Sequence, residues 1–281
     1  MSYNLPPFIK NFSADYLKYF NEATLIDGSS DPTDAFFTLL QSGINKKLGS
    51  SDMLKFIGSR TATINLVDTM TDVDIQAYID AVSKFIPTDH SMTFQFANGT
   101  YNSLEQALAW RGFFGGGVVR IYGNTVETNA NIKHTSQDVV LDFKGYNVNG
   151  IFMVANTCPM YVYNLRVEVD DEMEPCYFNQ CPGGNRAWYN HFVVNGVTNG
   201  GYGLLADTSA IVEARSNYFT GGYTSIYSAT NSNVYSNDND DITVQPVYGL
   251  RAAANGVIGK NSTQPTGTTA NELTAPGGEI R

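Results

Sequence analysis

The chain reads Tyr202-Gly-Leu-Leu-Ala206, then Ser225-Ile-Tyr-Ser-Ala229, then Tyr248-Gly-Leu-Arg-Ala252, and these stretches open three successive blocks of equal length, about 23 residues each. Each block holds two or three short β-rich runs and has no helical pattern. A repeat of this length is too short for a propeller blade and lacks the leucine-rich pattern, so it indicates one coil of a parallel β-solenoid. When the three blocks are aligned, residues of similar kind fall at equivalent positions. These sets are Ala206, Ala229 and Ala252; Ser209, Ser232 and Asn255; Ile211, Val234 and Val257; and Val212, Tyr235 and Ile258.

Earlier segments fit a similar frame. Ala155-Asn-Thr157 resembles Ala206-Asp-Thr208, which matches Met160 to Ile211, and Asn190-His-Phe192 recurs in the next coil as Asn217-Tyr-Phe219. Coils that stack at about 4.8 Å place equivalent side chains in ladders, with small or aliphatic residues inside and residues that tolerate positive φ at the turns. The sequence therefore predicts six or seven coils of about 23 residues from about position 115 onward. The expected strands are Val118–Tyr122, Val139–Phe143, Met160–Val169, Trp188–Val194, Ile211–Ala214, Asn233–Tyr235 and Gly256–Ile258.

Residues 1–90 have a different, helical character. Short amphipathic segments occur at 15–20, 32–40 and 52–57, and the clearest helix is expected from Thr71, as N-cap, to Phe85. A strand is expected over 92–96, followed by a short helix over Leu104–Trp110 that would plug the open end of the first coil. We thus divide the chain into a helical N-terminal attachment segment (1–90), a parallel β-helix (91–270) and a C-terminal tail (271–281). The apolar stripe of the clearest helix consists of Ile75, Tyr78, Ile79, Val82 and Ile86.

Composition and charge restrict the kinds of ligand and location that are expected for this protein. The 281 residues include 17 basic and 27 acidic side chains, and the resulting net charge of −10 disfavours binding to nucleic acid or anionic lipid. No run approaches the roughly 18 apolar residues of a membrane span, and no signal peptide is expected in residues 1–12. The three cysteines are predicted to be thiols of a reducing compartment, with no zinc site; they are Cys158, Cys176 and Cys181.

Two parts of the chain carry a family resemblance. Residues 92–101, 104–108, 113–117 and 119–123 resemble the start of pectate-lyase-like right-handed parallel β-helices, and more closely those of bacteriophage and prophage tail proteins. Residues 248–267 are similar to the C-termini of such tail-fibre proteins.

The resemblance implies an all-β right-handed parallel β-helix, and a tail fibre or tailspike component that binds the bacterial cell surface, with a glycan as ligand. It further implies a homotrimer on the virion tail, made in the host cytoplasm, with residues 1–90 attached to other tail or baseplate proteins. Outward aromatic residues also favour an oligomer. The alternatives are a polysaccharide depolymerase (lyase or glycoside hydrolase) on the same fold and a purely structural baseplate protein. We favour a protein that is not an enzyme, and we expect no cofactor.

Candidate site residues are aromatic or acidic. Aromatic rings among many Asn and Asp side chains suit sugar recognition, and half of them are equally explained as core or subunit contacts. The glycan-binding candidates are Trp188, Tyr189, Tyr218, Tyr223 and Tyr227. Acidic groups at 168–174 and 238–241 give only weak candidates for cation binding, since the ligand spacing of a calcium loop is absent and solvated acidic turns explain them. The weak candidates are Asp170, Asp171, Glu172, Asp238 and Asp240; no metal and no catalytic residue is assigned.

Overall fold

The computed structural model describes residues 37–41, 44–48, 62–123, 138–144, 150–170, 174–195 and 201–281. The chain divides into two units, Met1–Gly58 and Ser59–Arg281. In the first unit, β1 (Phe37–Gln41) pairs antiparallel with β2 (Ile44–Leu48). The helix predicted over 32–40 is therefore wrong where it overlaps β1, because a short apolar run is compatible with either state and strand pairing decides between them. The helices predicted over 15–20 and 52–57 lie outside the described residues.

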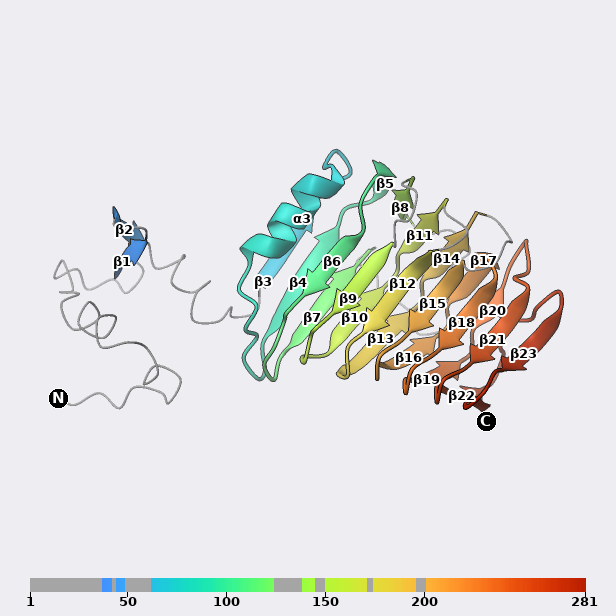
Figure 1. The fold of residues 1–281 in the computed structure, drawn as a ribbon. Coiled ribbons are helices and arrows are strands. Elements are labelled where there is room, and N and C mark those ends of the chain that lie inside the picture. The colour runs from blue at the N-terminus through green and yellow to red at the C-terminus, as the bar shows by residue number, and fades with distance from the viewer. Residues whose placement is uncertain are drawn as a thin grey trace. The chain divides into compact units, whose positions relative to one another are not determined.

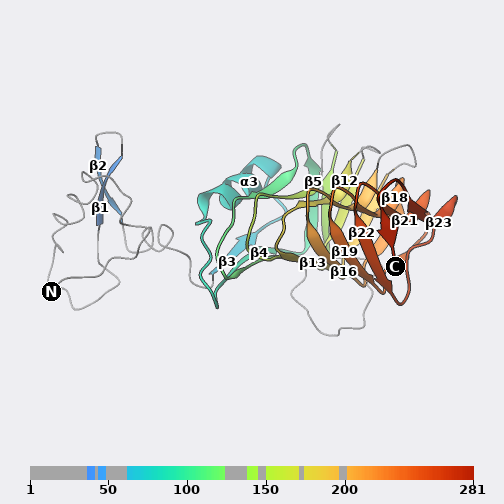
Figure 2. The same ribbon diagram turned by 60° about the horizontal axis from the view of Figure 1, so that its bottom comes forward.

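The second unit is a parallel β-solenoid of about seven turns, with about 26 residues per turn, so the predicted parallel β-helix is confirmed. Figures 1 and 2 show the strands of successive turns side by side in three sheets. The nine-stranded sheet contains β3 (Ala62–Leu66), β4 (Ser91–Phe96), β7 (Val118–Tyr122), β10 (Met160–Tyr163), β13 (Gly184–Trp188), β16 (Ile211–Arg215), β19 (Asn233–Asn237), β22 (Val257–Asn261) and β24 (Glu279–Ile280).

The other two sheets complete each turn. The six-stranded sheet contains β5 (Gly99–Leu104), β8 (Val139–Phe143), β11 (Arg166–Val169), β14 (His191–Val194), β17 (Tyr218–Gly221) and β20 (Asp240–Asp241). The seven-stranded sheet contains β6 (Leu108–Arg111), β9 (Ile151–Val154), β12 (Pro175–Gln180), β15 (Tyr202–Ala206), β18 (Thr224–Ser228), β21 (Tyr248–Ala252) and β23 (Ala270–Thr274). The stack therefore extends from β3 to β24, beyond the expected limits of 91 and 270 on both sides.

The register of the sheets corrects the predicted frame of constant length. Ile211 pairs with Asn233, and Asn233 pairs with Val257, so the first of these two turns is shorter than the second. The first and third blocks consequently align as predicted, whereas the middle block is displaced by one residue; Ser228, for example, stands between Ala206 and Ala252. Met160 likewise lies one position from the predicted match. A one-residue displacement exchanges the two faces of a strand, so a fixed frame assigns the middle block to the wrong face. The alignment of 190–192 with 217–219 is confirmed.

The interior combines aliphatic ladders with a buried ladder of asparagines. Asn190, Asn217 and Asn239 precede β14, β17 and β20 and are fully buried. The Asn217 Oδ1 accepts from the backbone N–H and the side-chain amide of Asn190, at 3.0 and 3.2 Å. Its Nδ2 donates to the Ala187 carbonyl at 2.7 Å and to the Asn239 Oδ1 at 3.0 Å. The side chains thereby satisfy backbone groups at a tight turn that the strands leave unpaired.

Helix α3 (Asp72–Ala81) covers the N-terminal end of the solenoid, beside β3 in Figure 1. Thr71 is its N-cap, as predicted, and forms a capping box with Asp74. Ile75 and Ile79 are fully buried, while Tyr78 is 48% exposed. The helix ends at Ala81 rather than Phe85.

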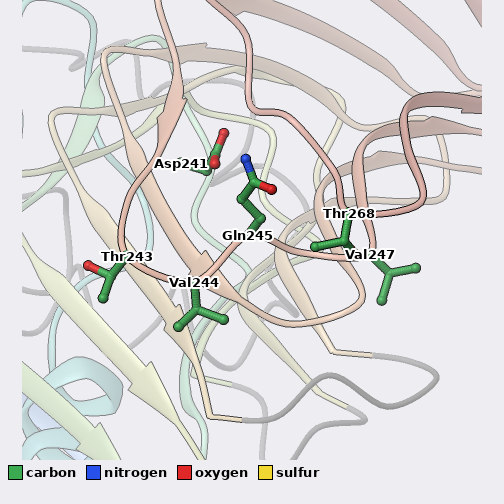
Figure 3. Close-up of a pocket in the computed structure, with 6 residues that line it drawn as sticks. All are labelled: Asp241, Thr243, Val244, Gln245, Val247 and Thr268. Carbon is green, nitrogen blue, oxygen red and sulfur yellow. The ribbon is translucent and has the colours of Figure 1, made fainter.

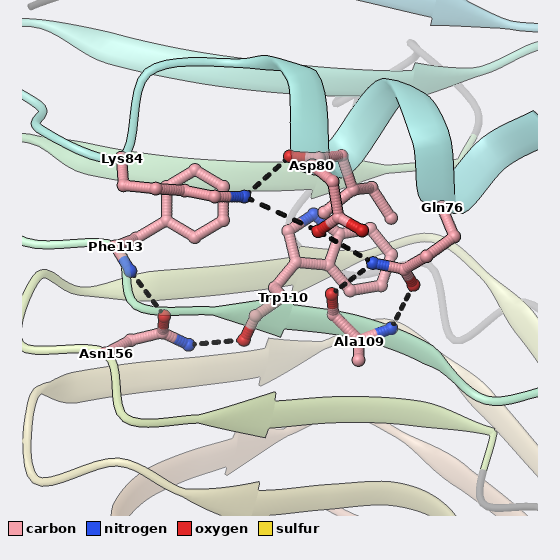
Figure 4. Close-up of polar contacts among 8 residues, drawn as sticks. Gln76, Asp80, Lys84, Ala109, Trp110, Phe113 and Asn156 are labelled. Atoms are coloured by element: carbon pink, nitrogen blue, oxygen red, sulfur yellow. Dashed lines mark hydrogen bonds and ion pairs between the residues drawn. The ribbon is translucent and has the colours of Figure 1, made fainter. Parts of the chain in front are cut away.

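The predicted helix over Leu104–Trp110 is wrong, and α3 takes the place of the plug. Leu104 ends β5 and Leu108 begins β6. Their four-residue spacing is typical of a helix. The two residues are both buried, but they belong to two different sheets. Figure 4 shows how α3 docks instead: the Gln76 side chain bonds to the Ala109 backbone, and the Lys84 ammonium donates to the Ile79 carbonyl and lies over the Phe113 ring. Among the described residues, no helix has the length and apolar character needed to cross a bilayer.

Candidate functional site: the outer face of the nine-stranded sheet

Alternate residues of the nine-stranded sheet point outward, and the parallel register aligns them in three rows that run along the stack. The first outer row contains Gly184, Ile211, Asn233 and Val257. The second outer row contains Arg120, Tyr161, Arg186, Glu213, Tyr235 and Gly259. The third outer row contains Tyr122, Tyr163, Trp188, Arg215, Asn237 and Asn261. Each turn from β7 to β22 thus contributes one residue to the second outer row and one to the third.

Aromatic rings in the third outer row stack along the solenoid. The ring centroids of Tyr122 and Tyr163 are 5.1 Å apart, and those of Tyr163 and Trp188 are 5.3 Å apart, with interplanar angles of 25° and 27°. On the next turn, the Arg215 guanidinium lies 5.6 Å from the Trp188 ring. The Trp188 ring is therefore flanked on both sides along the axis, and its faces contact protein groups.

Arg186 joins the second and third outer rows. Its guanidinium lies 4.6 Å from the centroids of both the Tyr161 and the Trp188 rings. Its Nε is 3.4 Å from the Glu213 Oε2, and both side chains are about one-third exposed. This contact is a surface ion pair between partly exposed side chains, and such pairs contribute little to stability.

A hollow of about 460 Å³ lies where the first and second outer rows meet. Gly184 and Gly259 occupy outward positions there; a Cβ on Gly184 would contact nothing within 4 Å, and one on Gly259 would contact only the Tyr235 ring, at 3.8 Å. The missing side chains create the depression. Ile211 and Tyr235 line it and are each 47% exposed, so an apolar surface lies beside the Arg186–Glu213 pair. A concave surface of this kind, with few placed polar groups, suits a small polar ligand such as a sugar.

The five predicted glycan-binding residues lie on different faces. Trp188 belongs to the third outer row, and the ring of its neighbour Tyr189 contacts it edge to face, with centroids 6.3 Å apart. Tyr218 is on β17 of the six-stranded sheet, where its ring contacts His191. Tyr227 lies on β18 of the seven-stranded sheet, and Tyr223 precedes that strand. The residues therefore do not form one site.

Tyr223 and Tyr227 belong to a separate cluster around Arg251. The Arg251 guanidinium lies 4.7 Å from the Tyr227 ring and 5.7 Å from the Tyr223 ring. Tyr202 packs against Tyr227, and Tyr248 packs edge to face against Tyr223. These rings also contact each other or the guanidinium, so the cluster is a packed aromatic surface on the seven-stranded sheet.

The acidic candidates form ion pairs and hydrogen bonds. Lys144 lies 2.9 Å from both Asp142 and Asp170, and Asn195 donates to Asp170 at 2.7 Å. Burial would raise the pKa of Asp170, but the bonds from Asn195 and Lys144 outweigh it and hold the pKa below its ordinary value. Glu168 pairs with Arg166. Asp171 and Glu172 lie outside the described residues.

The acidic group at 238–241 does not form a metal site either. The Asp240 Oδ1 accepts from the Asp241 backbone N–H at 3.0 Å, and Asp238 accepts from the Ser216 hydroxyl at 3.4 Å. Among the described residues, no group of three or more His, Cys, Asp or Glu side chains is placed to hold a metal ion.

A second depression, of about 630 Å³, lies at the turn after β20 (Figure 3). Three of its four polar side chains form hydrogen bonds: the Asp241 Oδ1 accepts from the backbone and hydroxyl of Thr266, Gln245 donates to the same hydroxyl, and the Thr268 hydroxyl donates to the Pro246 carbonyl. Val244 is exposed and lines it, and none of the described residues that line it is aromatic. The hollow beside Tyr235 has an exposed aromatic ring and is therefore the better candidate for a sugar-binding site.

Sequence reasoning missed most of the outer rows. It singled out Trp188 but not Tyr122, Tyr161, Tyr163, Arg186 and Arg215, which the register brings beside it. Alternation along each strand was a usable signal for which residues face outward. The unequal turn lengths concealed which of them are neighbours.

No family model matches this chain, and neither the curated proteins nor the solved structures contain a significant match to it.

Proposed function

We propose that this protein is a tail fibre or tailspike component of a phage or prophage, and that it binds a glycan on the bacterial surface through the hollow beside Tyr235. The observation that carries the binding proposal is the outer face of the nine-stranded sheet, where an exposed tyrosine, an exposed isoleucine and an ion pair surround a depression floored by glycines. The proposal of a tail protein rests on the resemblance described above together with the β-solenoid.

The geometry suits a chain-like ligand. The rows run along the stack, and successive turns are about 4.8 Å apart. A saccharide chain lying along the rows would meet a new side chain at each turn, and Tyr235 supplies an exposed ring with a hydroxyl as a polar handle. Asn233, Asn237 and Asn261 add amide groups along the same face, and amides both donate and accept hydrogen bonds.

The rival hypothesis is a depolymerase, and one observation favours it. Asp142 and Glu168 occupy neighbouring positions on adjacent turns of the six-stranded sheet, and glycoside hydrolysis uses two carboxyl groups. Each of these carboxylates is bound by a cation, Lys144 or Arg166, which is the arrangement of structural ion pairs. Hydrolysis needs one carboxyl group that gives up a proton. We therefore propose binding without cleavage.

The test of binding uses three variants of the purified full chain and whole cells of a panel of bacteria. Gly184→Val fills the hollow with a side chain that suits a strand, and Tyr235→Ala removes the exposed ring. Tyr78→Ala removes a tyrosine of matched exposure, 48% against 47%, from α3. We expect the two hollow variants to bind cells at least about tenfold more weakly and the Tyr78 variant to bind like the wild type. Equal binding by all four proteins would refute the site.

Two further measurements test the rest of the proposal. Release of reducing ends or unsaturated products from bound polysaccharide would establish the depolymerase instead. The tail-protein proposal includes a homotrimer and attachment to other tail or baseplate proteins. Light scattering checks the trimer, because the mass of a single chain is 30.7 kDa. A mass near three times that of the single chain is expected, and a mass near that of the single chain would refute assembly.

A further inference from the structure

Four arginines gather on the outer face of the nine-stranded sheet, although the chain is acidic overall; one of them, Arg281, lies after β24 and lines the hollow. Arg120, Arg186 and Arg215 come from β7, β13 and β16 and occupy the second and third outer rows. The chain has a net charge of −10, and the acidic pairs around Lys144 and Arg166 lie on the six-stranded sheet. The face that carries the hollow is therefore richer in cations than the chain as a whole.

Arg215 is the cation of this face with the most unused bonding capacity. No carboxylate of the described residues lies within ion-pair distance of it, whereas Arg186 is paired with Glu213 and Arg281 with Glu279. Arg120 donates to the Ser91 hydroxyl at 3.2 Å. Its register neighbour on the following turn is the neutral Asn237. Its side chain is held by Trp188, which is itself packed against Tyr163. The guanidinium is thus positioned by stacking, and its N–H donors have no anionic partner in the described part of the chain.

The chemistry of a stacked, unpaired guanidinium indicates the kind of sugar. A guanidinium has five N–H donors in a planar fork and no acceptor, and the fork matches the two oxygens of a carboxylate or phosphate. Stacking on Trp188 restricts the side chain before the ligand arrives, which reduces the entropy lost on binding. Because the Trp188 ring contacts Tyr163, Arg186 and Arg215, this part of the surface offers N–H groups rather than a free ring face.

We infer that the glycan bound on this face is acidic, and that Arg215 binds its carboxylate or phosphate group while the sugar ring occupies the hollow beside Tyr235. This inference rests on the proposed function and adds the chemical class of the ligand. A neutral glycan would leave the guanidinium without an anionic partner. Nucleic acid also presents phosphates, so binding to DNA is one of the outcomes that the experiment below distinguishes.

The experiment uses an array of purified bacterial surface polysaccharides in which each uronate-containing polysaccharide stands beside its carboxyl-reduced form. Poly(glycerol phosphate) and single-stranded DNA complete the array. We expect binding to an acidic glycan that falls about 10- to 100-fold on carboxyl reduction, or binding to poly(glycerol phosphate) if phosphate is the anion. Equal binding to the reduced forms, or equal binding to DNA, would overturn the inference while leaving surface binding intact. Binding to no polysaccharide would refute the proposed function itself.

Variants separate the role of Arg215 from general charge. Arg215→Gln removes the guanidinium, and Arg215→Lys keeps the charge but loses the fork. Arg111→Gln removes an exposed arginine that contacts the Phe152 ring at 5.8 Å on the seven-stranded sheet, so it is the matched control. We expect the Gln variant at 215 to lose about 10-fold or more in affinity for the acidic form only, the Lys variant to lose part of it, and the Arg111 variant to bind normally. Equal losses at 111 and 215 would overturn the assignment, and matching circular dichroism spectra and melting temperatures establish that all variants fold.

Discussion

The side-chain amide of Gln76 both donates a hydrogen bond to the backbone of Ala109 and accepts one from it, as the backbone of a neighbouring strand would. The Gln76 Nε2 donates to the Ala109 carbonyl at 3.0 Å, and the Ala109 N–H donates to the Gln76 Oε1 at 2.9 Å (Figure 4). Strand β6 is the edge of the seven-stranded sheet, where unpaired backbone groups invite pairing with another chain. A single side chain from α3 therefore closes this edge at its centre.

We predict that Gln76→Ala lowers the free energy of unfolding by about 1–3 kcal/mol, because the nearly buried Ala109 backbone loses both hydrogen bonds. Urea unfolding measures the loss, and hydrogen exchange should show a faster Ala109 amide. Val73→Ala is the control on the same helix, since the Val73 side chain is 61% exposed and makes no hydrogen bond, and such surface substitutions change stability little. Unchanged exchange at Ala109 would contradict the prediction.

Asn217→Ala should be among the most damaging substitutions in the solenoid. The fully buried side chain makes bonds to two other asparagines and to the Ala187 carbonyl, so its loss leaves several buried polar groups unpaired. At about 1–3 kcal/mol for each such group, we expect a loss of at least about 3 kcal/mol in urea unfolding. Asn271→Ala removes an exposed amide whose oxygen accepts from the Gly267 N–H at 3.2 Å, and it should cost less than about 1 kcal/mol. Comparable losses would be inconsistent with a structural role for the buried ladder.

Stability should fall in mild acid because of His191. Burial and the nearby positive charge of Arg166 lower the pKa of His191 to about 4, against about 6.5 in an unfolded chain. Since the folded pKa is the lower one, the contribution of neutral His191 is fully present above about pH 6.5 and is lost as the pH falls toward about 4, on the order of 3 kcal/mol in total. The urea midpoint should therefore fall more between these pH values in the wild type than in His191→Gln. An equal fall in both proteins would show that other groups dominate.

The three cysteines should resist thiol reagents in the folded protein. All are buried and free, and burial raises the pKa of Cys158 to about 12 and also raises the pKa values of Cys176 and Cys181. The thiolate is the reactive form, so little of it is present at mildly alkaline pH. Ellman's reagent should titrate almost no thiol in the native protein and all three in urea. Rapid reaction of one thiol in the native protein would disprove this.

The inward architecture could be predicted from the sequence because it depends on local pattern. Alternation along Val118–Tyr122 and Val139–Phe143 gave two strands with their bounds as observed, and Thr71 marked the start of α3. The helix expected over 104–110 failed because a four-residue spacing cannot distinguish one helix from two strands that meet at a corner. Only packing against α3 resolves that ambiguity.

The outer rows could not be predicted because they depend on the length of each turn. Tyr122 stacks on Tyr163 across one long turn, and Tyr163 stacks on Trp188 across a much shorter one. A repeat of constant length brings neither pair together. Neighbours across turns are determined by register, which the hydrogen bonds of the whole sheet specify together.

The alternation of inward and outward positions has a consequence for how such a surface changes over time. Core ladders and outer rows occupy different residues of the same strands, so substitutions at positions such as 211, 215 or 235 alter the surface without disturbing the interior. Duplication or loss of a whole turn would lengthen or shorten each row by one side chain, about 4.8 Å, and leave the direction of the others unchanged. Selection on the partner and selection on folding can thus act on separate sets of residues.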